Sequence, residues 1–312
     1  MQLAPPLTSE TARRLEWRFL PPPLRTMIER RCGSPVVEAQ SQNRGFTPGF
    51  ASVLICEDGS RHFVKAASAR AQPVFADAYR EEARKLAALP AAAPAPALLW
   101  VEDDDWVVLG IEHVEADQPA RPWQLGDLDR CLDTLEAAAE VLTPAPEALA
   151  LETFEAELAS FVGHWESVLA RRPDLAHGEE AAALAAGFAE VTRGDTVVHT
   201  DLRDDNVLLA RDGRTLFCDW NWPVVGAPWL DSLLLLVGPR GDGIDVDAVI
   251  RARPLLHDVP AEAVDAVLAL VTGYFLKSAG DPVPSTSPYL RDHQRWQGEV
   301  CWEWLAERRG WA

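Results

Sequence analysis

Residues 198–209 read VHTDLRDDNVLL, and residues 216–220, beyond a short Asp-Gly turn, read LFCDW. Apolar, strand-like runs accompany both segments. Asp201, Asn206 and Asp219 can each accept a proton or ligate a metal ion, and they follow one another in a fixed order. A hairpin with acidic turns would give a similar pattern, but carboxylates beside apolar strands are costly without a partner. We therefore take these two segments as the candidate functional centre.

The order H-x-D-L-x-x-x-N followed by D-W resembles that of the aminoglycoside phosphotransferase family, a branch of the protein-kinase-like superfamily. The resemblance implies an α+β, two-lobed protein-kinase-like fold. Its N-terminal lobe would be an antiparallel sheet plus a helix, and its C-terminal lobe mainly helical. It further implies an enzyme that uses ATP and Mg²⁺ to phosphorylate a hydroxyl of a small molecule. In motif order it extends from about residue 45 to residue 231.

Phosphoryl transfer needs a carboxylate to receive the acceptor's hydroxyl proton, and oxygen ligands to hold Mg²⁺ against the phosphates. The resemblance implies that Asp201 orients and deprotonates the attacking hydroxyl, while Asn206 and Asp219 ligate the metal. It assigns His199 to packing of the catalytic loop. Asp231, from the similar string D-W-x-x-x-x-x-G-x-P-x-x-D, would brace the backbone of that loop.

A kinase-like cleft also needs a lysine on the third strand and a glutamate on the following helix. Only three of the 29 basic residues are lysines, and Lys65 lies within the strand-like run RHFVKA, residues 61–66. We expect Lys65 to bind the α- and β-phosphates of ATP and Glu82 to pair with it, with Glu81 as the adjacent alternative. An isolated strand lysine could instead reach solvent, but its position upstream of the acidic motif favours the nucleotide site.

Two further segments are expected to meet the nucleotide through their backbones. Residues 109–114, LGIEHV, resemble the hinge between lobes, where Glu112 and Val114 would pair with the adenine edge. Residues 43–50, NRGFTPGF, stand where a phosphate-binding loop belongs but lack the G-x-G-x-x-G pattern. Either phosphate cradling or a plain turn fits this segment.

The catalytic-loop string departs from the family's commonest form at two places. Thr200 stands where a small residue usually follows the histidine, and Arg203-Asp204-Asp205 replace the frequent H-P-G. Arg203 could approach the transferring phosphate, or it could form a salt bridge with Asp204 or Asp205. The sequence leaves both open.

Periodicity predicts the following strands and helices before residue 112: strands at 35–41, 50–56, 61–66, 97–101 and 106–111, and helices at 22–32 and 76–89. The later part is predicted to be mainly helical, with segments at 127–142, 152–170, 179–191, 228–237, 260–277 and 289–309 around a hairpin of 206–210 and 215–218. We place the lobes at 1–112, carrying the nucleotide-binding sheet and helix, and 113–312, carrying the catalytic loop, metal ligands and acceptor-binding helices.

Composition limits the partners. The formal net charge of −19 argues against nucleic acid and suits a cationic acceptor, although acidity also serves solubility. The five cysteines form no C-x-x-C pair, so reduced thiols are expected. No apolar run approaches the ~20 residues of a membrane helix, and the first residues do not resemble a signal peptide. We expect a cytoplasmic protein with no membrane partner, and the oligomeric state stays open.

The acceptor is less well specified. The last helix carries side chains that could line its pocket or meet ammonium groups, or that could simply be core: Tyr289, Trp296, Trp302 and Trp304, with Glu299 and Glu303.

Several functions remain compatible with this pattern. The preferred one is a small-molecule kinase, for a cationic aminoglycoside-like antibiotic or for a metabolite such as an amino sugar, choline or homoserine. A catalytically silent nucleotide-binding protein is a second. A metal-dependent hydrolase using His199, Asp201 and Asp219 is a third, but it leaves Lys65 and Glu82 without a purpose.

Overall fold

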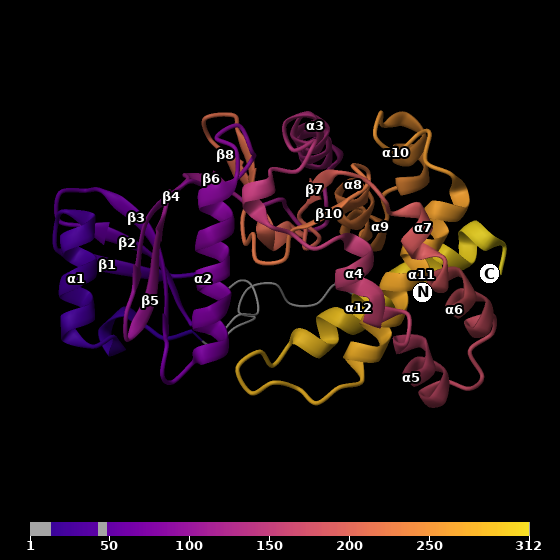
Figure 1. The fold of residues 1–312 in the computed structure, drawn as a ribbon, viewed down its shortest axis with the longest axis horizontal. Coiled ribbons are helices and arrows are strands. Elements are labelled where there is room, and N and C mark those ends of the chain that lie inside the picture. The colour runs from indigo at the N-terminus through magenta and orange to yellow at the C-terminus, as the bar shows by residue number, and fades with distance from the viewer. Residues whose placement is uncertain (1–13, 43–48, 312) are drawn as a thin grey trace.

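The computed structural model describes residues 14–42 and 49–311 (Figure 1). Its N-terminal part is an antiparallel sheet of five strands in the order β1-β2-β3-β5-β4. The strands are β1 (Val36–Ser41), β2 (Phe50–Cys56), β3 (Arg61–Ser68), β4 (Leu98–Asp103) and β5 (Trp106–Ile111). The turn between β2 and β3 uses Gly59 with a φ of 84°, a left-handed conformation that favours glycine. Residues 43–48 of the expected phosphate-binding loop lie outside the described residues.

One helix covers each face of this sheet. α1 (Pro22–Cys32) packs Leu24 and Ile28 against Phe50 of β2. α2 (Pro73–Ala88) packs Tyr79 on the opposite face, which is the side nearer the rest of the molecule (Figure 1). Successive residues of β5 therefore enter two small cores, Val108 on the side of α1 and Val107 and Leu109 on the side of α2, and α2 lies between the sheet and the helical part.

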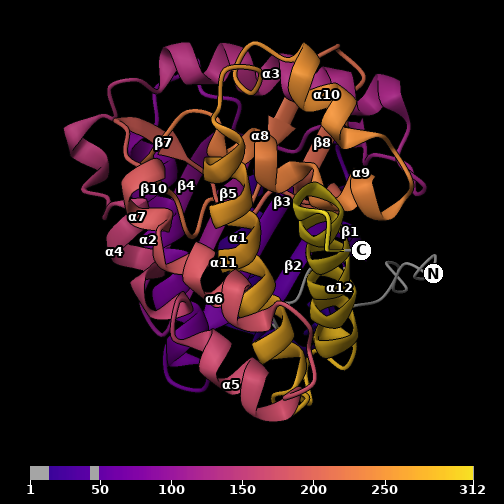
Figure 2. The same ribbon diagram turned by 90° about the vertical axis from the view of Figure 1, so that its right-hand side faces the viewer.

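The remainder is mainly helical and contains the largest core (Figure 2). Its helices are α3 (Leu125–Val141), α4 (Phe154–Leu158), α5 (His164–Arg171), α6 (Gly178–Ala186), α7 (Phe188–Val191), α8 (Leu230–Leu235), α9 (Val237–Gly241), α10 (Val246–Ala252), α11 (Ala261–Ala279) and α12 (Leu290–Arg309). α11 is buried along most of its length and packs against α12. The two longest helices of this lobe therefore support each other.

Two small sheets are inserted among the helices and hold the central motif. β8 (Val207–Ala210) pairs with β9 (Thr215–Phe217) and with β6 (Ala116–Asp117), while β7 (Thr196–Val198) pairs with β10 (Val224–Gly226). The expected catalytic loop runs from β7 to β8, and Asp219 follows β9. Strand pairing thus fixes the ends of both loops.

Most predicted elements occur within a few residues of their expected bounds, but strands β6, β7 and β10 were not predicted and several helices differ. The helix expected over 152–170 is divided into α4, a 3₁₀ turn and α5, and the one over 179–191 breaks between α6 and α7. Gly163 and Gly187 lie at these breaks, where glycine costs a helix about 1 kcal/mol relative to alanine. The segment 228–237 forms two short helices, and α10 was not predicted.

None of the helices that the structure describes is long and apolar enough to cross a lipid bilayer.

Candidate active site

Lys65 on β3 lies where the sheet meets the central motif. Its Nζ donates to both carboxylate oxygens of Glu82 on α2, at 2.7 and 2.9 Å, and to Oδ1 of Asp219 at 3.0 Å. The Glu82 side chain is only 1% exposed and that of Lys65 12%. Glu81, the alternative partner, points elsewhere and pairs with Arg84. One ammonium group therefore joins three elements that are far apart in sequence.

The loop between β7 and β8 brings Asp201 and Asn206 together. The Asn206 amide Nδ2 donates to the Asp201 main-chain oxygen at 2.8 Å and to its Oδ2 at 3.2 Å. Arg203 donates to Oδ1 of Asp201 and forms a two-pronged contact with Asp205, at 3.0 and 3.1 Å. Of the two roles left open for Arg203, this structure shows the salt bridge, and its partner is Asp205. Asp204 pairs instead with Arg121.

The backbone of this loop is strained, and residues outside the loop hold it in place by hydrogen bonds. Thr200 has a φ of 70°, an unusual value for a β-branched residue. Asp231 at the start of α8 accepts hydrogen bonds from the backbone N–H groups of His199 at 2.6 Å and Thr200 at 2.9 Å. The buried His199 ring contacts the main-chain oxygen of Cys218 at 3.0 Å. These contacts fix the path of the loop that presents Asp201.

Asp219 also lies on left-handed backbone, with a φ of 69°. Its Oδ1 accepts from Asn221 Nδ2 at 2.6 Å, and Oδ1 of Asn221 is buried without a hydrogen-bond partner. Asn206 uses its Nδ2 as the donor to Asp201, which leaves its amide oxygen as an acceptor. Carboxylate and amide oxygens are what Mg²⁺ prefers, so the residues present fit a magnesium ion.

The surroundings of Asp201 and Asp219 shift the pKa values of these two side chains in opposite directions. Burial raises the pKa of Asp201 to about 6, although the neighbouring Arg203 opposes the shift. Burial would also raise the pKa of Asp219, but the Lys65 ammonium outweighs it and holds that pKa below its ordinary value. Asp219 is thus kept as an anion suited to a cation, while Asp201 has the more basic carboxylate.

A cavity of about 510 Å³ opens beside these groups. Asp201, Arg203 and Asp219 form its polar end, and α11 and α12 supply much of the rest. This volume is in the range of sites for drug-sized ligands. The site therefore places the reactive carboxylate at the end of a space that can hold a second molecule.

The residues expected to line an acceptor pocket do not line this cavity. Trp304 is fully buried, Trp296 is core, and Tyr289 is 39% exposed and is not among the lining residues. Trp302 and Glu303 line a separate hollow of about 280 Å³. Glu299 pairs with Arg172. Helical spacing alone cannot tell which face of α12 meets the cavity, because that depends on how α12 packs on α11.

Sequence reasoning missed the residues of α12 that do line the cavity. These are Leu290, His293, Gln294 and Gln297. They recur at three- and four-residue intervals, and Gln294 and Gln297 are buried amides with exposures of 7% and 8%. Buried glutamines on one stripe of a helix were the available signal.

The hinge residues follow β5. The backbone N–H of Glu112 donates to the main-chain oxygen of Ala97 at 2.8 Å, and its carboxylate accepts from Arg214 at 2.8 Å. Among the described residues, no backbone hydrogen bond engages the N–H of Val114. The Glu112 carboxylate therefore has a structural contact, which leaves the backbone of this residue for a ligand.

Neither a protein-family model nor a curated protein matches this sequence, but solved structures match the chain. The choline kinase LicA from Streptococcus pneumoniae superposes with a TM-score of 0.61 at 14% identity, covering 91% of this chain and 99% of its own. An aminoglycoside phosphotransferase from Alicyclobacillus acidocaldarius gives 0.54 at 16% identity, with coverages of 88% and 92%. The chain has the protein-kinase-like fold.

A third structure with the kinase-like fold is that of a spectinomycin phosphotransferase in complex with ADP and spectinomycin. It has a TM-score of 0.59 at 11% identity and covers 92% of this chain and 98% of its own. The predicted α+β, two-lobed architecture is thus confirmed, and the likeness to the first two of these structures covers 91% and 88% of the chain. At these identities the likeness is one of fold.

Proposed function

We propose that this protein is a phosphotransferase that uses ATP and Mg²⁺ to phosphorylate a hydroxyl of a small molecule. The observation that carries the proposal is the contact of Lys65 with both Glu82 and Asp219 beside Asp201. A hydrolase would need Asp201 and Asp219 but not a lysine held between a helix glutamate and the second aspartate. A phosphate-binding cation needs that arrangement.

The nucleotide would lie between the lobes. In this proposal residues 1–112 form the nucleotide-binding lobe and 113–312 the catalytic lobe. Lys65, held by Glu82, binds the α- and β-phosphates, and backbone groups of Glu112 and Val114 meet the adenine edge. Asn206 and Asp219 would hold Mg²⁺, which neutralises charge on the phosphates when bound.

The transfer itself is assigned to the catalytic loop. Asp201 orients the acceptor hydroxyl and takes its proton as the oxygen bonds to the γ-phosphorus. The bond between that phosphorus and the β–γ bridging oxygen breaks, and ADP leaves. Arg203 contacts Asp201 in this structure, and we propose that its guanidinium turns to the transferring phosphoryl group when ATP is present. We place this reaction in the cytoplasm, on a small-molecule acceptor without nucleic acid.

The decisive experiment measures acceptor-dependent ADP formation with Mg²⁺, comparing the wild type with Asp201→Asn. We expect the variant to lose ~100- to 10,000-fold in turnover, the usual contribution of a general base, while binding MgATP. Asp258→Asn, at a carboxylate that is 91% exposed, is the matched control and keeps full turnover. Full turnover by Asp201→Asn would refute the mechanism.

A silent nucleotide-binding protein remains the second candidate, because its fold and nucleotide contacts would be the same. It predicts tight MgATP binding with no acceptor-dependent turnover. The complete set of Lys65, Asp201, Asn206 and Asp219 favours the enzyme, since silent binding has no use for the proton acceptor.

A further inference from the structure

The cavity beside Asp201 is mostly apolar. Eleven of the twenty residues that line it are apolar or aromatic, and five of these are aromatic. Phe161 and Tyr274 form one wall as a parallel stack, with ring centroids 4.3 Å apart and planes inclined by 4°. Both side chains line the cavity, so the pair gives it an apolar, aromatic wall of the kind that holds rings or branched hydrocarbon.

The stacked pair lies next to the reacting end. Tyr274 lines the same cavity as Asp201, and the negative charge of Asp201 adds to the burial that raises the pKa of Tyr274. Trp222, 59% exposed, also belongs to the lining and adds a further aromatic side chain that reaches solvent. An acceptor whose hydroxyl meets Asp201 would therefore lay its body against aromatic rings.

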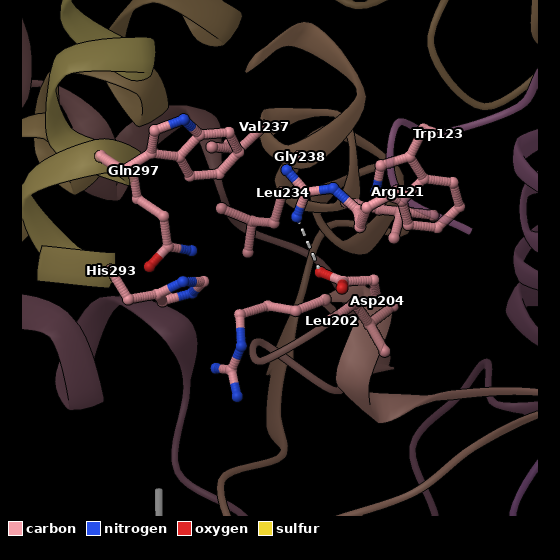
Figure 3. Close-up of a pocket in the computed structure, with 12 residues that line it drawn as sticks. Arg121, Trp123, Leu202, Asp204, Leu234, Val237, Gly238, His293 and Gln297 are labelled. Atoms are coloured by element: carbon pink, nitrogen blue, oxygen red, sulfur yellow. Dashed lines mark hydrogen bonds and ion pairs between the residues drawn. The ribbon is translucent and has the colours of Figure 1, made fainter. Parts of the chain in front are cut away.

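Another part of the lining, on α12, is polar but uncharged. His293, Gln294 and Gln297 come from α12. His293 and Gln297 also line a smaller neighbouring pocket, in which Figure 3 shows them side by side, across from Arg121 and Asp204. Burial lowers the pKa of His293 to about 4, so its ring is neutral at pH 7. Amides and a neutral imidazole offer hydrogen bonds to hydroxyl, ether or carbonyl groups.

The lining holds few charges to neutralise a polycation. Apart from Asp201 and Asp219, which the reaction uses, Glu157 is the only carboxylate among the described residues of the lining. Glu157 is exposed, and it already interacts electrostatically with Lys85. Several ammonium groups would lose their hydration in this cavity without gaining partners, which is strongly unfavourable.

We infer that the acceptor is a neutral or singly cationic alcohol with a bulky apolar body, and not a polyamine sugar. The body lies on Phe161 and Tyr274, its polar groups face Gln294 and Gln297, and its hydroxyl reaches Asp201. This inference rests on the proposed phosphotransferase function. It also differs from the preference for a cationic acceptor that the net charge of −19 suggests, because that charge is spread over the whole chain.

The test uses two acceptor panels with the full-length protein. One contains bulky alicyclic and macrocyclic alcohols with no more than one amine, and the other contains amino sugars with three or more ammonium groups. MgATP-dependent ADP formation is measured for both, and binding to Asp201→Asn is measured in parallel by tryptophan fluorescence. We expect saturable turnover and binding with the first panel and neither with the second.

Two variants connect this preference to the cavity. Phe161→Ala removes half of the aromatic stack, and we expect kcat/KM for the best apolar acceptor to fall by at least ~10-fold, mainly through KM. Phe19→Ala, at a phenylalanine 61% exposed on the other lobe, should leave it unchanged. Thermal unfolding of both variants establishes that they are folded.

The outcomes distinguish the proposed acceptor class from the proposed phosphotransferase function. Turnover with the polyamine panel and not the apolar one overturns the inference and keeps the phosphotransferase. Binding of apolar alcohols without any turnover overturns the phosphotransferase and keeps the acceptor class. An unchanged KM in a folded Phe161→Ala overturns the placement of the acceptor, and no binding or turnover with either panel contradicts both.

Discussion

Lys65 shares one charge between two carboxylates, Glu82 and Asp219, which come from different parts of the chain. Burial would lower the pKa of Lys65, but the carboxylates of Asp219 and Glu82 more than offset it and hold that pKa above its ordinary value. The lysine is therefore charged at any physiological pH. A buried pair of this kind is costly to break, since the remaining partner is left without compensation.

Lys65→Ala should lower turnover and also destabilise the fold by about 3–5 kcal/mol, because Glu82 keeps a buried carboxylate without a cation. The double variant Lys65→Ala with Glu82→Gln should recover much of the stability but none of the turnover. Urea unfolding and ADP formation measure the two effects separately. Lys277→Ala, which removes a lysine outside the cavity lining, is the control. Normal turnover in Lys65→Ala would remove this residue from the site.

His293 makes stability depend on pH. Its pKa is lowered to about 4, first by burial and then by the positive charges of Arg203 and Arg121, while Asp205 acts in the opposite direction. The unfolded chain binds a proton below about pH 6.5, and the folded chain does so only near pH 4. Stability is therefore complete above pH 6.5 and declines as the pH falls from 6.5 toward 4.

When the pH falls from 7.5 to 5, protonation of this histidine should lower the free energy of unfolding of the wild type by about 2 kcal/mol. The free energy of unfolding of His293→Gln should fall by about 2 kcal/mol less than that of the wild type over the same pH interval, as measured by urea unfolding at each pH. His257→Gln, at a half-exposed histidine, should behave like the wild type. Identical pH profiles for all three proteins would show that His293 does not resist protonation in the fold.

Among the elements, the start of α8 supports the catalytic loop. Asp231 is 8% exposed and its two oxygens accept from the two backbone N–H groups that precede Asp201. Thr200, which carries the second of these N–H groups, has left-handed backbone, and a β-branched residue adopts this conformation only when its surroundings enforce it. The loop conformation thus depends on a helix more than twenty residues further along the chain.

Asp231→Ala leaves both N–H groups without their acceptor, and we expect a loss of about 2–4 kcal/mol in stability together with lower kcat. Asp231→Asn keeps one acceptor oxygen, and its stability and kcat should lie between those of the wild type and those of the alanine variant. The KM for ATP should change little, since Asp231 does not touch the lysine of the nucleotide site. A stable Asp231→Ala with normal kcat would refute the brace.

Over the whole molecule, contacts of α2 hold the two lobes together around the cleft. Lys85 donates to the main-chain oxygen of Asn221 at 2.6 Å, and Arg84 donates to that of Leu149 at 2.7 Å. Together with the Lys65–Asp219 pair, they position the sheet over the catalytic loops. A ligand that bridges Lys65 and Asp219 would add to the same set of contacts.

MgATP should therefore raise the thermal unfolding temperature of the entire protein, by an amount that grows with ligand concentration. At 100 times the Kd the gain is about 2.7 kcal/mol. Asp219→Ala should lose the part of this gain that requires Mg²⁺, whereas Asp201→Asn should keep it. Differential scanning fluorimetry with ATP, Mg²⁺ and both together measures it, and an unshifted wild type would argue against a nucleotide site.

The sequence by itself determined the local elements and the identity of the central motif. The strands at 50–56 and 106–111 and the helix at 22–32 agree with the structure residue for residue, because period-two and helical patterns, Asp-Gly turns and proline boundaries act over a few residues. The order of Lys65, Glu82, Asp201, Asn206 and Asp219 could likewise be read without coordinates. Geometry now supports their proximity, and their roles stay proposals.

Only the tertiary structure decided which side chains meet the acceptor cavity. The last helix was predicted, but its tryptophans fill the core or line a separate hollow, while His293, Gln294 and Gln297 line the same cavity as Asp201. The sequence left the partner of Arg203 open, and it wrongly predicted continuous helices across Gly163 and Gly187, where the structure has breaks. Such features depend on how α11 and α12 pack against each other and against the loops, and packing between distant segments leaves no periodic signal in the sequence.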